Sequence, residues 1–219
     1  TISVTLSKTV KIKVSDYIEI FDKAAEKQFA AITLWIQDSK KYISFRGTDS
    51  SLVGWKEDLN MGFRKDVPSQ KEAVKYLDSI ANKYKDNLIV GGHSKGGNLA
   101  VYSAVFCKDN VKDRIERVIN ADGPGFDNSV ILTNNYKKML NRIQTYIPQS
   151  SIVGRLLEHE EEYQVVKSVQ KGIMQHDIYS WQVLGTKIVQ MEELTNGSEF
   201  INKTIRNWLK ETTPEQRKN

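Results

Sequence analysis

The chain has 219 residues, of which 39% are hydrophobic and 27% are charged. This composition is typical of a soluble globular protein, and the length suits one α/β domain with a sizeable core. The formal net charge is +5, but lysine and arginine are interleaved with acidic residues along most of the chain, which gives little support to nucleic-acid binding. We therefore expect a single domain that spans residues 1–219.

Cysteine content and hydropathy bear on the compartment. Cys107 is the only cysteine, so no disulfide can form within the chain and an oxidising compartment is not required. No apolar run approaches the length of a membrane span, and no signal peptide is visible. We expect a cytoplasmic protein without a membrane span, whose positive charge would still allow peripheral contact with an anionic lipid surface.

The N-terminal part of the chain predicts an edge segment, a helix and a pair of strands. Residues 1–14 alternate apolar and polar side chains in places, which indicates an edge hairpin or an irregular entry segment. Ser15 and Asp16 resemble a helix N-cap, so residues 17–28 are predicted to be helical. Strands are predicted at residues 31–36 and 42–45, and the short polar connection between them predicts an antiparallel pair.

The rest of the chain alternates helices and strands. Pro68 begins a predicted helix that runs to about residue 85, and Ser69 with Glu72 matches a capping box. Apolar strands are expected at residues 88–90, 117–121, 143–147 and 163–166. The fourth of these is expected to be the final strand, and residues 198–210 are expected to form an amphipathic helix. This alternation predicts an α/β fold, a mostly parallel central sheet with helices on both faces.

Residues 92–96, GHSKG, form the motif around which the other elements are organised. They follow a buried strand and precede a helical pattern, which is the context of the nucleophile elbow G-x-S-x-G. Ser94 would occupy a strained turn, and a Cβ at either flanking glycine would collide with the neighbouring strand or helix. The helix would direct its first N–H groups at an oxyanion beside the serine. We predict that Ser94 is a nucleophile; the alternative is a glycine-rich turn with an incidental serine.

A second motif, FRGT at residues 45–48, ends the second strand of the antiparallel pair. Thr48 lies where an oxyanion donor would be supplied, although it could instead cap a helix. FRGT followed by a tryptophan and an Asp-Leu pair, and then by GHSxGGxLA, resembles class 3 (fungal-type) lipases of the α/β-hydrolase superfamily. The likeness covers residues 31–181, and it is closer still to a bacterial group of lipase-like proteins with lysine after the serine. The resemblance implies an α/β-hydrolase fold, an oxyanion hole from Thr48 and Lys95, and a lid over residues 49–55.

A base must take the proton of a serine hydroxyl near neutral pH, and histidine is suited to that role. His93 is expected to point away from the nucleophile and to be structural, and His159 to be solvated in an acidic surface run. His176 follows the strand expected to be the last, which is where the chain order of an α/β hydrolase places the base. We therefore predict that His176 is the base.

The identity of the acid stays open in the sequence. Class 3 lipases carry it after the strand that follows Asp122, where this chain has Gln-Ser-Ser and no carboxylate. Asp122 ends the preceding strand, where some other lipases place the acid, but an Asp before Gly also caps turns. Asp177 is next to the base and poorly placed. If Asp122 is not the acid, the serine and histidine would act as a dyad aided by Ser150 or Ser151.

Three further side chains have two interpretations each. Lys95 is a cation in the first turn of a helix, which opposes the helix dipole. It could attract anionic head groups or carboxylates, or it could extend to solvent. Trp55 and Trp181 could line an acyl pocket or belong to the core.

Together these features predict a serine hydrolase that cleaves carboxylic esters through an acyl-enzyme. Ser94, His176 and Asp122 are the predicted catalytic residues, with Thr48 and Lys95 as oxyanion donors. A small-molecule ester or lipid substrate is suggested by the resemblance alone, and no cofactor or metal is expected. The alternatives are a thioesterase or acyltransferase with the same nucleophile, and a non-catalytic lipase-like binding module.

Overall fold

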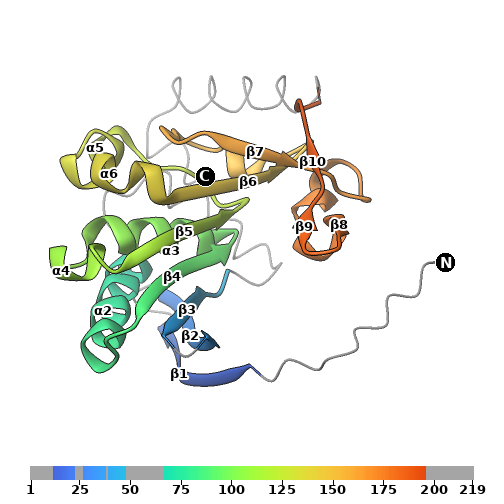
Figure 1. Cartoon of the computed structure of the whole chain (residues 1–219). Helices are drawn as coiled ribbons and strands as arrows, with labels where there is room; N and C mark the ends of the chain where they lie inside the picture. The colour runs from blue at the N-terminus through green and yellow to red at the C-terminus, as the bar shows by residue number, and fades with distance from the viewer. Residues whose placement is uncertain (1–11, 23–26, 38, 48–66, 196–219) are drawn as a thin grey trace.

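The computed structural model describes residues 12–22, 27–37, 39–47 and 67–195 (Figure 1). Within these residues, eight strands form one sheet in the order β1-β2-β3-β4-β5-β6-β7-β10. Strands β3 to β7 are parallel, whereas β1, β2 and β10 pair antiparallel with their neighbours. The predicted mostly parallel central sheet is therefore confirmed. The strands are β1 Lys13–Asp22, β2 Lys27–Gln37, β3 Lys40–Phe45, β4 Asn87–His93, β5 Ile115–Ala121, β6 Ile143–Pro148, β7 Tyr163–Val166 and β10 Gln190–Met191.

The antiparallel end of the sheet contains one confirmed prediction and one wrong one. The pair β2 and β3 is antiparallel, as predicted. The helix predicted over residues 17–28 is wrong, because this part of the chain lies in β1 and β2. Ile18 and Ile20 pack against the core and alternate with exposed neighbours, which is the period of a strand. Asp16, the expected cap, instead lies at an irregularity in β1 with a positive φ of 55°.

Helices cross from strand to strand along one face of the parallel sheet. Helix α2 (Pro68–Lys83) connects β3 to β4, and α3 (Lys95–Phe106) connects β4 to β5. The strands follow one another in a single direction, so right-handed crossovers place successive helices on the same face. Helices α2 and α3 accordingly pack against each other. The other helices that the structure describes before β6 are α4 Asp109–Lys112, α5 Asn128–Ile131, α6 Asn134–Met139 and the 3-10 turn η1 Leu140–Arg142.

The main hydrophobic core lies between these helices and the sheet. Leu77 of α2 and Leu99 of α3 are fully buried, together with Val90 and Val118 of the central strands. Each such side chain contributes roughly 1.5–3 kcal/mol when it is removed from water. Helix α3 is buried along almost its whole length, so the turn that precedes it is held on a rigid support.

The start of α2 differs from the predicted capping box. The N-cap is Val67, and the Gln70 side chain accepts a hydrogen bond from the Val67 N–H at 3.4 Å. Ser69 lies inside the helix, where its hydroxyl donates to the carbonyl of Gln28 at 3.2 Å. The predicted capping box of Ser69 and Glu72 is wrong. The Ser69 hydroxyl bonds to strand β2 instead of accepting from a free N–H group at the start of α2.

The chain continues well beyond β7, which was expected to be the last strand. Between β7 and β10 the described chain forms the 3-10 turns η3 Gly172–His176 and η4 Ile178–Ser180, followed by a short hairpin of β8 Val183–Leu184 and β9 Lys187–Ile188. Strand β10 then returns to pair with β7. A further 3-10 turn, η2 Val153–Arg155, follows β6. The excursion from β7 to β10 carries His176, whose side chain contacts Asp122 just after the carboxyl end of β5.

Several predicted features lie outside the described residues: Thr48, the expected lid at 49–55 with Trp55, and the expected helix at 198–210. Among the helices that the structure does describe, none has the length and apolar character needed to span a membrane.

Candidate active site

Ser94 lies in a strained turn between β4 and α3. Its backbone has φ 58° and ψ −132°, a conformation that is uncommon for a residue with a side chain and costs of order 1–3 kcal/mol. The Ser94 N–H donates to the carbonyl oxygen of Ala121 in β5 at 2.9 Å. The neighbouring strand thereby helps to hold the turn.

The positions of the glycines that flank Ser94 leave no room for a Cβ atom, as predicted. A Cβ on Gly92 would lie 2.3 Å from the carbonyl carbon of Gly96, and one on Gly96 would lie 2.2 Å from the carbonyl oxygen of Phe45. A Cβ on Gly47, just before the position of Thr48, would lie 3.3 Å from the Cβ of Ser94. The end of β3 and the start of α3 therefore approach each other at backbone distance around the serine.

His176 and Asp122 meet at the same edge of the sheet. The Nδ1 of His176 lies 2.7 Å from Oδ2 of Asp122, although the two residues are 54 positions apart. The Asp122 side chain is 1% exposed and that of His176 is 20% exposed. Asp122 follows Ala121, whose carbonyl oxygen accepts the Ser94 N–H. The carboxylate, the imidazole and the serine turn thus share the carboxyl ends of β4 and β5.

The loop after β6 supports the Asp122 carboxylate. Its Oδ1 accepts hydrogen bonds from the Ser151 hydroxyl at 2.5 Å and from the Gly154 N–H at 3.1 Å. A Cβ on Gly154 would lie 2.3 Å from that oxygen, so only glycine leaves room for it. This is the Gln-Ser-Ser loop, at which class 3 lipases carry the acid. Instead of a carboxylate, it supplies donors to the carboxylate of the preceding strand.

The segment that carries His176 is anchored on both sides. Gln175 is buried, and its side chain accepts from the Ser150 N–H at 2.7 Å and donates to the Gln170 carbonyl at 2.9 Å. The Gln175 carbonyl in turn accepts from the indole N–H of Trp181 at 2.9 Å. Trp181 is buried against Ala121 and Val166, in agreement with the core interpretation. Sequence reasoning missed Gln175, because nothing in its immediate neighbourhood distinguishes it from a surface glutamine.

The sequence predicts that His93 points away from the nucleophile and the site around it, and this prediction is wrong. The Nε2 of His93 lies 2.6 Å from the backbone oxygen of His176, and the two imidazole rings are in tilted contact with their centroids 4.6 Å apart. Burial and the neighbouring His176 lower the pKa of His93 below its ordinary value. The only signal in the sequence was its place next to Ser94.

Lys95 corrects both interpretations of its side chain. The residue is 1% exposed, and its Nζ donates to the carbonyl oxygen of Gln28 in β2 at 3.1 Å. It therefore neither extends to solvent nor presents a surface charge to anionic groups. The Lys95 amide belongs to the first turn of α3, where backbone N–H groups point out of the helix end towards the serine side. Thr48, the other expected oxyanion donor, lies outside the described residues.

His159 is also not solvated. Its Nδ1 lies 3.0 Å from Oε1 of Glu161, a buried carboxylate that also accepts from Thr145 and Tyr136. Burial raises the pKa of Glu161, but the hydrogen bond and charge of His159, with the other two donors, outweigh it and lower the pKa to about 2. The prediction is wrong for His159, which turns inward with Glu161 between β6 and α6, whereas the other carboxylates of the acidic run, Glu158, Glu160 and Glu162, are exposed.

The sequence profile of one protein family covers almost the entire chain, matching residues 5–219. The chain belongs to the Mbeg1-like family. A search of curated proteins finds no match for it.

The solved structures similar to this Mbeg1-like chain include fungal lipases. The native Rhizomucor miehei lipase propeptide complex aligns with a TM-score of 0.54 at 18% identity, over 71% of this chain and 57% of that one. A deletion mutant of the same complex gives 0.52 at 19% identity, over 71% and 56%. A Penicillium expansum triacylglycerol lipase gives 0.49 at 11% identity, over 75% and 73%. The chain thus spans somewhat more than half of the Rhizomucor protein, and the likeness to that protein shows a lipase-like α/β-hydrolase fold, as predicted.

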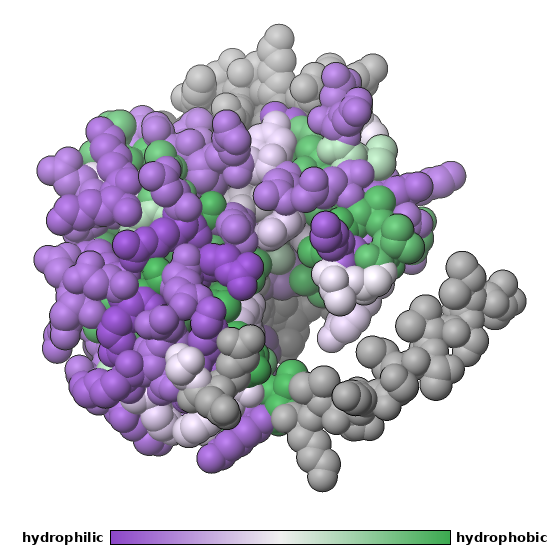
Figure 2. All heavy atoms as spheres, viewed as in Figure 1, coloured by the Kyte–Doolittle hydropathy of each residue, from purple (hydrophilic) through white to green (hydrophobic). Residues whose placement is uncertain are grey.

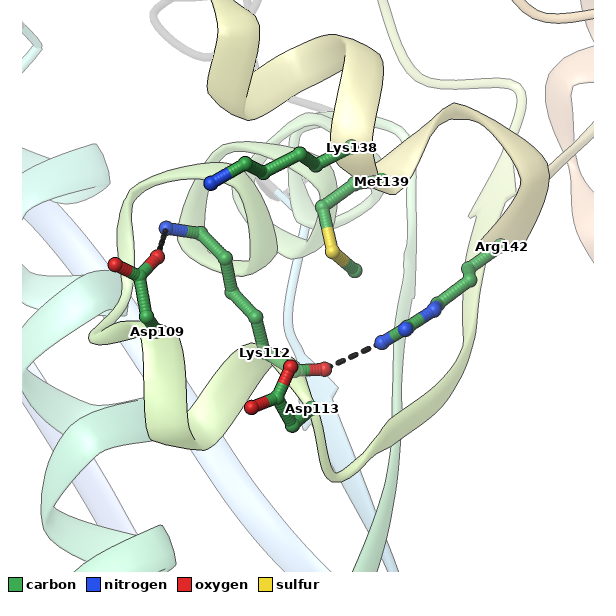
Figure 3. A pocket seen from close by; sticks show the side chains of 6 residues that line it. All are labelled: Asp109, Lys112, Asp113, Lys138, Met139 and Arg142. Carbon is green, nitrogen blue, oxygen red and sulfur yellow. Dashed lines mark hydrogen bonds and ion pairs between the residues drawn. The ribbon is translucent and has the colours of Figure 1, made fainter.

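The described part of the Mbeg1-like chain also contains a hollow, whose lining does not include Ser94, Asp122 or His176 (Figure 3). It measures about 370 Å³ and is lined by Asp109, Lys112, Asp113, Lys138, Met139 and Arg142. These residues precede β5 and β6, so the hollow opens at the amino ends of the strands, opposite Ser94. Lys112 is paired with Asp109 at 3.0 Å, and Arg142 donates to the Lys112 carbonyl. Within the described residues, no group of three His, Cys, Asp or Glu side chains is arranged to hold a metal ion.

Proposed function

We propose that this chain is a serine hydrolase that cleaves carboxylic esters through an acyl-enzyme intermediate. The observation that carries the proposal is the 2.7 Å contact between His176 Nδ1 and the buried Asp122 carboxylate, beside a serine in a strained strand-to-helix turn. A lipase-like fold alone would not be enough, because one fold serves many functions.

The carboxylate defines the tautomer of the imidazole. The Asp122 carboxylate accepts a hydrogen bond from the Nδ1–H group, so Nε2 of neutral His176 is left with a lone pair. This nitrogen takes the proton of Ser94 as the hydroxyl oxygen attacks the ester carbonyl carbon. Asp122 stabilises the resulting imidazolium by charge and by the hydrogen bond.

The tetrahedral intermediate then needs donors for its oxygen. The Lys95 amide in the first turn of α3 supplies one, and Thr48 supplies the second by its place after Gly47. Collapse of the intermediate breaks the ester bond, and His176 Nε2 gives its proton to the leaving alcohol. A water molecule activated by the same nitrogen hydrolyses the acyl-enzyme and restores Ser94.

Exposed apolar side chains favour an apolar ester at a lipid surface as the substrate. Tyr179 is 95% exposed and Leu184 is 78% exposed, and both belong to the excursion that carries His176. Other large exposed apolar residues in the same excursion are Val169, Ile173, Met174, Ile178 and Val183. Figure 2 shows hydrophobic side chains gathered around β8, β9 and β10. Such patches are typical of surfaces that meet a membrane or another protein.

The experiment is the hydrolysis of p-nitrophenyl butyrate by the wild type, Ser94→Ala and Ser103→Ala. Ser103 lies in α3, the helix that Ser94 precedes, where its buried hydroxyl donates to the Ala100 carbonyl, so it is a matched control for the loss of one hydroxyl. We expect Ser94→Ala to lose at least about 10³-fold in kcat/KM and Ser103→Ala to keep wild-type turnover. Turnover by folded Ser94→Ala at the wild-type rate would reject the proposal.

A further inference from the structure

His93 touches the same histidine in two ways. Its Nε2 lies 2.6 Å from the backbone oxygen of His176, and because a carbonyl oxygen can only accept, this nitrogen carries the hydrogen. The two rings also contact each other in a tilted arrangement, with a centroid distance of 4.6 Å and an interplanar angle of 38°. One side chain therefore holds both the main chain and the ring of His176.

These two contacts restrict a motion that Asp122 cannot restrict. A single hydrogen bond at Nδ1 fixes one atom of the imidazole, and the ring can still swing about that point. The bond to the backbone oxygen fixes the position from which the side chain starts, and the contact between the tilted rings adds a weaker restraint on the swing. The direction of Nε2 therefore depends chiefly on the hydrogen bond, with the ring contact as the lesser restraint.

His93 lies next to Ser94, so it can hold His176 at a fixed position relative to the serine. His93 is the last residue of β4, and Ser94 is the next residue of the chain. His176, in contrast, belongs to a long excursion between β7 and β10. His93 thus connects the excursion directly to the strand that carries the serine.

We propose that His93 is a positioning residue that aligns Nε2 of His176 with Ser94 by tying His176 to the end of β4. This inference rests on the proposed function. The role requires the neutral form, because a second positive charge next to the imidazolium would oppose its formation. Among the described residues, the charged and titratable groups that act on His93 are His176 and the Asp122 and Asp177 carboxylates, and the Trp181 ring lies nearly perpendicular to it at a centroid distance of 6.5 Å. Burial and His176 itself keep the pKa of His93 low, which favours the neutral form.

Two substitutions separate the contacts. His93→Gln keeps an N–H donor for the His176 carbonyl and removes the ring, whereas His93→Phe keeps a flat ring and removes the donor. A misplacement of the base by about 1 Å can cost about 100-fold in rate. We expect His93→Phe to lose about 10- to 100-fold in kcat with KM little changed, and His93→Gln to stay within about 5-fold of the wild type. If His93→Phe does not fold, as judged by its thermal unfolding, His93→Leu takes its place.

A second measurement does not depend on turnover. NMR follows the Nδ1 proton of His176, which is hydrogen-bonded to Asp122. We expect this proton to exchange with water faster in His93→Phe than in the wild type or in His93→Gln. Unchanged kcat and unchanged exchange in His93→Phe would overturn the proposal, as would equal losses of kcat in both variants. If wild-type protein hydrolyses no ester, the proposed function fails, while the exchange rates still decide whether His93 holds His176.

Discussion

Replacing Asp122 with asparagine changes one atom at the centre of the site. The buried Asp122 carboxylate accepts from His176 Nδ1, the Ser151 hydroxyl and the Gly154 N–H. In Asp122→Asn the amide oxygen can keep the Ser151 and Gly154 bonds. The amide nitrogen then faces His176 Nδ1, and two donors cannot bond to each other.

The imidazole resolves this conflict by moving its proton. If Nδ1 gives up its hydrogen and accepts from the amide, Nε2 becomes the protonated nitrogen and can no longer take the proton of Ser94. The imidazolium also loses the charge that stabilised it. We therefore expect a loss of about 10³- to 10⁴-fold in kcat, or about 4–5.5 kcal/mol of barrier, with a much smaller change in folding stability.

The assay is the pre-steady-state and steady-state hydrolysis of p-nitrophenyl butyrate by Asp122→Asn. Asp127→Asn is the matched control: Asp127 caps α5 by accepting from the Ser129 N–H, and asparagine caps helices equally well. Turnover by Asp122→Asn within about 10-fold of the wild type would refute the reasoning, because a base with the wrong tautomer should not work that well.

Three other changes have calculable effects. In Gly96→Ala, the new Cβ would lie 2.2 Å from the Phe45 carbonyl oxygen, so we expect about 1–3 kcal/mol of destabilisation in urea unfolding; an unchanged midpoint would contradict the elbow geometry. Gln175→Ala leaves the Ser150 N–H without its acceptor, and we expect a cost of about 1–3 kcal/mol and a lower kcat, which stopped-flow hydrolysis would detect. The pKa of Glu161 is lowered from 4.5 to about 2, so its contribution to stability is complete above pH 4.5 and is lost as the pH falls towards 2. That loss is on the order of 3 kcal/mol, and Glu161→Gln should show a flatter stability curve over the same range; equal curves would show that Glu161 is not the cause.

The elements that could be predicted from the sequence are those whose signals are local. The elbow needs a strand, small residues and a helix within a few positions, and all three stand together around Ser94. The apolar runs of β4, β5 and β6 were likewise predictable, because strands buried in a parallel sheet read as continuous hydrophobic segments.

The helix predicted from Tyr17 failed because its apolar residues fit two periods. Ile18 and Ile20 suit a strand, and Phe21 together with the later alanines suits a helix face. Pairing with β2 decided the outcome, since tertiary contacts override local preference. Burial of Lys95 has a similar origin: its partner, the Gln28 carbonyl, lies in a strand whose proximity no local pattern reveals.

The acid could not be chosen from the sequence, because its contacts join distant segments. Asp122 meets His176 across 54 positions and Ser151 across 29. The Gln-Ser-Ser loop after β6 has no carboxylate where class 3 lipases carry the acid. Instead, this loop donates hydrogen bonds to the Asp122 carboxylate, which lies one strand earlier. His93 was misassigned for the same reason, since its partner comes from an excursion whose path depends on strand β10.

The most direct test of the account is covalent labelling with a fluorophosphonate, read by intact mass and by peptide mapping. A serine is phosphonylated only when a neighbouring base activates it. We predict one probe per chain on Ser94, no labelling of Ser94→Ala, and labelling slowed at least about 100-fold in His176→Asn. Folded wild-type protein that stays unlabelled, or that carries the probe on another residue while Ser94 is free, would contradict the central claim.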